Sequence, residues 1–309
     1  MTPVYAVLVA VGSAFLFALA EISHRNGLRF ASPAMSSILT VGVQWLIYTV
    51  AVLAFADPSA FTLSGSLWFL AAGLMNPCLF LTFFLLGIQR IGVARSSPIK
   101  GSAPIFSVLF ALAFLGERLR PLQYLAIALV IGGILVISTE GLARRPLGFP
   151  AAPLGRGRGE NPAKAPARKI DYVFPLLAGV AAGAGSVLFK VSLGKMPFPL
   201  LGAWLGTSMG FLLFPLLAFF FPREGRYHAR PAALPWVALA GLCSSAALYG
   251  LILAIGLGQV SIVFTLNQTS PLFVLLLSVF FLRQLERVTP RVAFGAALTV
   301  SGGVLVSLL

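Results

Sequence analysis

Two ionisable side chains stand inside long apolar segments of the sequence, where charge is costly. Glu21 lies in the first such segment and Lys100 in the fourth, whereas the other acidic residues fall in loops or at segment ends. Ionisable groups within a membrane usually face the interior of a helix bundle and mark a site. Glu21 is therefore a candidate proton-coupling residue, and Lys100 is a candidate ligand for an anionic substrate group. A structural Glu21–Lys100 ion pair, or side chains that extend to the interface, are the alternatives.

Uncharged polar residues gather beside prolines in other apolar segments. Asn76 precedes Pro77, and Asn267-Gln268-Thr269-Ser270 precedes Pro271. A proline removes a helix hydrogen bond and frees a carbonyl, and transporters build their midplane sites on such broken helices. Hydrogen bonding between helices is the alternative role. The predicted substrate-binding residues are Asn76, Lys100, Ser244, Tyr249, Asn267 and Gln268.

The composition indicates which elements must position these residues. Of the 309 residues, 59% are hydrophobic and only 10% are charged, and the mean hydropathy is +0.97. So apolar a chain cannot cover a soluble surface, and in a bilayer its apolar segments must be helical. We predict an all-α integral membrane protein with ten transmembrane helices. They lie roughly at 4–24, 34–56, 67–88, 94–115, 121–139, 172–190, 199–221, 234–256, 260–282 and 290–308.

The chain divides into two similar halves around a segment of different composition. Residues 141–170 are rich in Pro, Gly, Ala and Arg and show no periodic pattern, so they are predicted to be a disordered basic linker. The predicted repeats, 1–140 and 171–309, share the pairs Pro104 with Pro271 and Glu117 with Glu286. Five helices per half is an odd number, so the two halves are predicted to be inverted relative to each other, as in many secondary transporters.

Basic residues set the predicted orientation. With the N-terminus outside, 17 of the 22 lysines and arginines fall in loops or linker on the cytoplasmic side. The positive-inside rule then predicts both termini outside and residues 141–170 in the cytoplasm, with the protein in the cytoplasmic (inner) membrane. Most of the net charge of +14 thus lies beside the cytoplasmic leaflet, and no nucleic-acid partner is needed to explain it.

These motifs resemble a known family. The segment Pro104–Leu115, followed by Gly116-Glu117-Arg118-Leu119 and then by a segment with Gly132-Gly133, is similar to the EamA repeat of the drug/metabolite transporter superfamily. The second half repeats the pattern through Pro271, Glu286 and Gly302. The resemblance implies a transporter but names no substrate, because the family moves many unrelated metabolites. Family topologies often place both termini in the cytoplasm, which the charge distribution here opposes.

The functional hypothesis is a secondary active transporter. It would export a small metabolite, such as an amino acid or a similar polar or amphiphilic solute, by alternating access, with gates near Glu21 and Lys190. Proton coupling through Glu21 is an option. The alternative is a non-transporting accessory subunit. An enzyme is not expected, since the apolar segments hold neither paired carboxylates nor a Ser–His arrangement, and no nucleotide-binding loop occurs.

Expected partners are the substrate and the lipid bilayer, with the chain a monomer or a homodimer. No cofactor or metal is expected, because the two histidines and two cysteines lack partners at metal-ligand spacing. Gly202, Gly206 and Gly210 predict close helix packing, with a homodimer face as the alternative. Trp45 and Trp204 are candidates for cavity walls or for packing.

Overall fold

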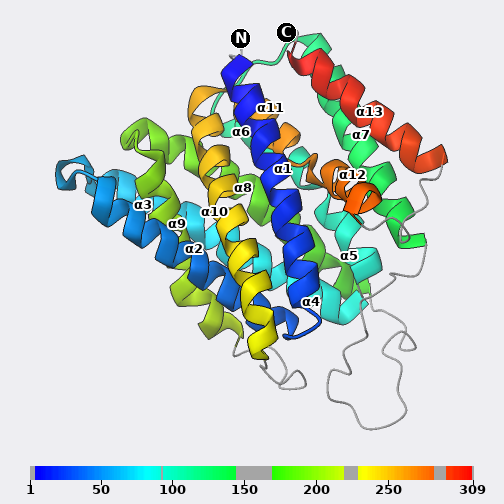
Figure 1. Ribbon diagram of the computed structural model, residues 1–309. Helices are drawn as coiled ribbons and strands as arrows, with labels where there is room; N and C mark the ends of the chain where they lie inside the picture. Colours follow the sequence, from blue (N-terminus) through cyan, green and yellow to red (C-terminus); the bar gives the residue numbers. More distant parts are fainter. Residues whose placement is uncertain (1–3, 92, 144–168, 219–228, 282–289, 308–309) are drawn as a thin grey trace.

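The chain folds into a bundle of helices. A computed structural model describes residues 4–91, 93–143, 169–218, 229–281 and 290–307, and the regular structure in these ranges is helical apart from one isolated bridge between Ala31 and Ala229 (Figure 1). Six helical stretches of the described chain are long and apolar enough to cross a membrane, and four shorter apolar helices accompany them. The predicted linker falls outside the described residues at 144–168.

The helices of the first half follow the predicted apolar segments. They are α1 (Val4–Gly27), α2 (Pro33–Phe55), η1 (Pro58–Ala60), α3 (Leu63–Gly73), the π-helical η2 (Leu74–Leu79), α4 (Phe80–Ile91), α5 (Val93–Lys100), α6 (Ala103–Phe114) and α7 (Pro121–Ala143). Those of the second half are η4 (Lys169–Tyr172), α8 (Val173–Lys195), α9 (Pro199–Ala218), η5 (Pro231–Ala233), α10 (Leu234–Leu257), α11 (Val260–Asn267), α12 (Ser270–Phe281) and α13 (Pro290–Ser307).

Three of the apolar segments are interrupted where a proline predicted a break. Within η2, Asn76 leaves the helical conformation with φ −142° and ψ 112°. Helix α5 ends at Lys100 and α6 restarts at Ala103, while α11 ends at Asn267 and α12 restarts at Ser270. Pro104 and Pro271 are each the second residue of the restarted helix, where a missing N–H costs nothing. The breaks therefore place Asn76, Lys100 and Asn267 at interrupted backbone.

The main helix partnerships join one half of the chain to the other. Helix α1 packs along α10, α7 along α13 and α2 along α9, while α8 lies against α3, α4 and α6 (Figure 1). The core lies where α8, α10 and α11 meet, and its largest fully buried side chains include Phe69, Phe189, Ile252 and Leu266. Neither half therefore encloses the core alone.

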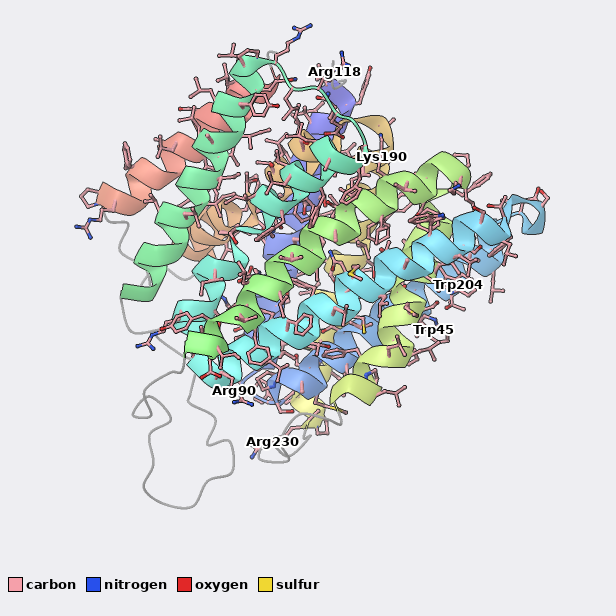
Figure 2. The ribbon with its side chains drawn as sticks, turned by 180° about the vertical axis from the view of Figure 1, so that it is seen from behind. Trp45, Arg90, Arg118, Lys190, Trp204 and Arg230 are labelled. Atoms are coloured by element: carbon pink, nitrogen blue, oxygen red, sulfur yellow. The ribbon has the colours of Figure 1, made fainter. Side chains whose placement is uncertain are left out.

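The two ends of the bundle carry different residues. The start of α1, the end of α13, Arg118 and Lys190 lie at one end, here named the Lys190 end (Figures 1 and 2). Arg90 and Arg230 lie at the opposite end, named the Arg90 end (Figure 2). Both described termini are thus on the same side, which is the arrangement that the topology prediction requires.

The glycine stripe of α9 packs against α3 and η2. A Cβ atom on Gly210 would lie 2.6 Å from Pro77 Cγ, and one on Gly202 would meet the ring of Phe69. Between them, Gly73 and Gly206 bring the two backbones into direct contact. The prediction of close helix packing along this stripe is confirmed.

This contact yields a stability prediction. Gly73→Ala should destabilise the protein by about 1–3 kcal/mol, because the added methyl group would collide with the Gly206 backbone, which cannot rotate away as a side chain can. Gly12→Ala is the matched control, since its Cβ would meet nothing within 4 Å and alanine is the better helix former. Thermal unfolding in one detergent compares the two variants. Equal midpoints would contradict the backbone contact.

Helices α2 and α9 are joined by two reciprocal tryptophan hydrogen bonds. Trp45 Nε1 donates to Ser208 Oγ at 3.0 Å, and Trp204 Nε1 donates to Thr49 Oγ1 at 2.9 Å. The Trp45 ring also stacks on Phe211 at a centroid distance of 4.9 Å. Figure 2 shows both tryptophans at this seam. Of the two predicted roles, the structure assigns them packing between helices.

Candidate functional site

Lys100 occupies an aromatic environment at a helix break. Phe80 and Phe84 are one turn apart on α4, and their rings stack at a centroid distance of 6.1 Å. The Lys100 ammonium lies 5.6 Å from the Phe80 ring centroid and 4.8 Å from that of Phe84, within cation–π range. Within the described ranges, Lys100 makes no hydrogen bond or ion pair. Its half-buried charge is therefore available to an anionic group.

Glu21 does not form the hypothesised ion pair with Lys100. Its carboxylate instead lies 3.3 Å from Arg25, one turn further along α1, and both side chains are about half exposed, at 48% and 47%. Salt bridges at this spacing and exposure contribute little stability. Glu21 nevertheless lies close enough to Lys100 and to His24 to interact with each electrostatically. The carboxylate is thus accessible and lies within electrostatic range of two titratable groups.

His24 belongs to this ionisable group, although sequence reasoning considered it only as a metal ligand. Its Nδ1 lies 3.5 Å from both Ser36 Oγ and Thr40 Oγ1 on α2. The spacing of three residues from Glu21 places both on one face of α1, and this signal could have found it. Glu21, His24 and Lys100 together form what we name the ionisable cluster, contributed by α1 and α5.

Asn267 lies in a buried hydrogen-bond chain that joins three helices. Its Nδ2 donates to Ser13 Oγ at 2.8 Å, and Ser13 Oγ donates to the Ala247 carbonyl at 2.6 Å. The chain thereby connects α11, α1 and α10. Among the described residues, no donor reaches the Asn267 side-chain oxygen, so this atom is a free acceptor at the α11–α12 break. Ser13 was missed because one serine in an apolar segment carries no pattern of its own.

The other predicted residues have different surroundings. Asn76 packs against Gly185 of α8, and Ser244 donates to its own helix at the Ala240 carbonyl. Tyr249 is 38% exposed, and Gln268 follows the end of α11. No hydrogen bond or ion pair between described residues joins any two of the seven predicted side chains. The described residues therefore include two polar positions, the ionisable cluster and the Asn267 chain, that no direct hydrogen bond or ion pair connects.

Comparison with known proteins identifies the family. The sequence profile of the EamA-like transporter family matches residues 4–139 and, a second time, residues 170–308. The chain belongs to the EamA-like transporter family. This EamA protein is thus a member of the drug/metabolite transporter superfamily, and its apolar helices make it a multi-pass membrane protein.

A solved structure supports the fold of the EamA chain. It is titled "Crystal structure of protein", shares 20% sequence identity and has a TM-score of 0.77 over 98% of this chain and 96% of the other. At this identity the likeness is one of fold. No curated protein matches the sequence closely enough to compare.

Proposed function

We propose that the protein is a secondary active transporter that exports a small metabolite across the cytoplasmic membrane by alternating access. The observation that carries this proposal is the double family match, one for each half of the chain. Each half also finds its main helix partners in the other half. Two halves of five helices that are threaded in the same order are inverted relative to each other. If the two halves exchange conformations, the two ends of the bundle open in turn.

The ionisable cluster suggests the class of substrate. A carboxylate could replace the aromatic rings as the partner of Lys100 and gain a charge-assisted contact in a half-buried position. The side-chain oxygen of Asn267 could accept a hydrogen bond from an ammonium or hydroxyl group. An amino acid or a similar solute carries both kinds of group. Substrate binding by Lys100 and Asn267 is therefore the proposal, with Gln268 at the same break as Asn267 and Asn76 at the break within η2.

Reconstituted vesicles test the transport activity. Purified protein in vesicles loaded with a pool of unlabelled amino acids and carboxylates should accumulate the matching labelled solute by counterflow. A carrier saturates and shows counterflow because its site faces one side at a time, whereas a pore does neither. Absence of uptake and counterflow for every solute in the pool, with folded protein in the vesicles, would favour an accessory subunit instead.

Glu21 is the proposed coupling residue. Glu21→Gln should abolish the response of transport to an imposed pH gradient while counterflow persists, because glutamine keeps the size but cannot carry a proton. Asp57→Asn is the control, since Asp57 lies in the loop after α2, far along the chain from the ionisable cluster. An unchanged response to the pH gradient in Glu21→Gln would remove Glu21 from coupling.

The orientation in the membrane is a further proposal. An impermeant thiol reagent added outside intact cells should label a cysteine placed near residue 309 and spare one placed near residue 155. The reason is the concentration of basic residues in the loops and linker that the sequence predicts to be cytoplasmic. Labelling near residue 155 but not near residue 309 would show that the protein has the opposite orientation in the membrane.

A further inference from the structure

Glu117 holds the start of a helix to which it does not belong. It follows α6, and its two carboxylate oxygens accept hydrogen bonds from Val260 N at 2.6 Å, Ser261 N at 3.1 Å and Ser261 Oγ at 2.6 Å. These are among the backbone donors that an α-helix leaves unpaired at its N-terminus, where negative charge is favoured. A single side chain from the first half thus caps α11.

Lys190 holds the end of the preceding helix. From α8, its ammonium donates to the carbonyls of Ile255 at 2.7 Å, Gly256 at 3.2 Å and Gly258 at 2.9 Å. The unpaired carbonyls at a helix C-terminus favour positive charge. Lys190 and Glu117 therefore hold the two sides of one turn, residues 255–261, between α10 and α11. We name this arrangement the Glu117–Lys190 clamp.

The clamp sits where water can reach it. Glu117, Lys190 and Gln259 line a cleft of about 350 Å³ at the Lys190 end, together with Leu115, Leu257 and Gly258. Figure 2 shows Lys190 and the neighbouring Arg118 at this end of the bundle. Below the clamp, all eight residues of α11 are buried. The clamped turn thus lies between the cleft and the buried residues of α11, which ends at Asn267.

We propose that the Glu117–Lys190 clamp is the gate of the Lys190 end. The proposal rests on the alternating access proposed above and adds Glu117 as a positioning residue. By contrast, α2 and α3 are each capped by the neutral hydroxyl of the residue directly before the helix, Ser32 and Thr62 respectively. The α10–α11 turn is instead held by full charges from other elements. Both charges border the cleft, so water can replace their contacts when the turn moves away.

Two reporter cysteines test the gate without a substrate. Both native cysteines are first replaced by alanine. Thr265→Cys then reports on α11 below the clamp, where the native side chain is 1% exposed, and Ser96→Cys reports on α5 at the other end, where it is 0% exposed. An impermeant maleimide is applied to each face of right-side-out and inverted vesicles, so the readout does not depend on the topology proposal.

Glu117→Gln should raise the labelling rate of Thr265→Cys from the Lys190 side by about tenfold, because the neutral amide replaces a charge that accepts three hydrogen bonds. Labelling of Ser96→Cys from the Arg90 side should fall at the same time, since opening one end closes the other. Arg118→Gln, the exposed neighbour, should change neither rate. If Glu117→Gln does not fold, Ser261→Ala takes its place. This variant removes one of the three donors and should change both labelling rates in the same directions, but by less.

Two results would overturn the gate. Faster labelling of Thr265→Cys with an unchanged rate at Ser96→Cys would show that the clamp is a local helix cap. Unchanged rates at both reporters would show that the turn stays closed without it. Neither result bears on whether the protein transports a solute, which the counterflow experiment decides separately.

Discussion

Lys100→Met is expected to reduce transport of an anionic substrate by about a hundredfold, the size of effect seen when one partner of a buried charge contact is removed. Methionine keeps the length and apolar stem of lysine but leaves the substrate carboxylate without a partner. The variant should fold at least as well as the parent protein. Within the described residues no anionic group is paired with Lys100, so the substitution leaves no orphaned charge behind.

The counterflow rate measures the loss of transport in Lys100→Met, and thermal unfolding measures the stability of the variant. Lys195→Met is the matched control, because Lys195 is exposed at the end of α8, at the opposite end of the bundle from Arg90. The double variant Glu21→Gln with Lys100→Met tests the electrostatic interaction between the two groups. If Lys100→Met alone is unstable and the double variant recovers, Lys100 serves mainly to neutralise Glu21. Wild-type transport and stability in every variant would dismiss both roles.

Asn267→Ala is expected to raise the substrate KM about tenfold, because a hydrogen-bonding side chain of this kind typically contributes about 1 kcal/mol or somewhat more. Two effects contribute to this change. The substitution removes the free side-chain oxygen, and it also breaks the bond to Ser13. A structural role alone would lower the unfolding midpoint and the amount of active protein rather than the affinity of the site.

Ser13→Ala separates the two effects. It removes the hydrogen bonds from Asn267 and to the Ala247 carbonyl but keeps the Asn267 amide in place. We expect Ser13→Ala to destabilise the protein while KM changes less than in Asn267→Ala. If the two variants alter KM equally, and the double variant adds nothing, Asn267 acts only through the helix contact. Asn76→Ala, measured alongside, tests the separate break within η2 of the first half.

Much of the helical framework was predictable from the sequence. Runs of apolar residues bounded by Pro, Gly and Arg identify the segments, because the bilayer imposes both length and composition. The breaks at Asn76, Lys100 and Asn267 were predictable as well, since each precedes a proline that cannot continue the helix. What the sequence shows is therefore where each segment lies along the chain.

The partners of individual side chains were not predictable in the same way. Two ionisable side chains of opposite charge in apolar segments suggested a Glu21–Lys100 pair, but Arg25 lies one turn away from Glu21 on the same helix and pairs with it instead. Tyr249 is a predicted site residue as an aromatic candidate for a cavity wall, and its 38% exposure could not be derived from the sequence pattern. The hydrogen bond from Ser261 to the Glu117 carboxylate joins residues 144 positions apart in the sequence, and no local pattern reveals such a contact.

The partnership of each helix with the opposite half has a consequence for biogenesis. When α7 enters the membrane during synthesis, its partner α13 does not yet exist, and α1 likewise waits for α10. The nascent first half must therefore remain in the bilayer with its glycine-lined faces, such as that at Gly133, open to lipid. Two separately made chains, divided between residues 144 and 168, would present complementary faces to each other. Such split halves should assemble in the membrane, whereas either half alone would be a substrate for quality-control proteases.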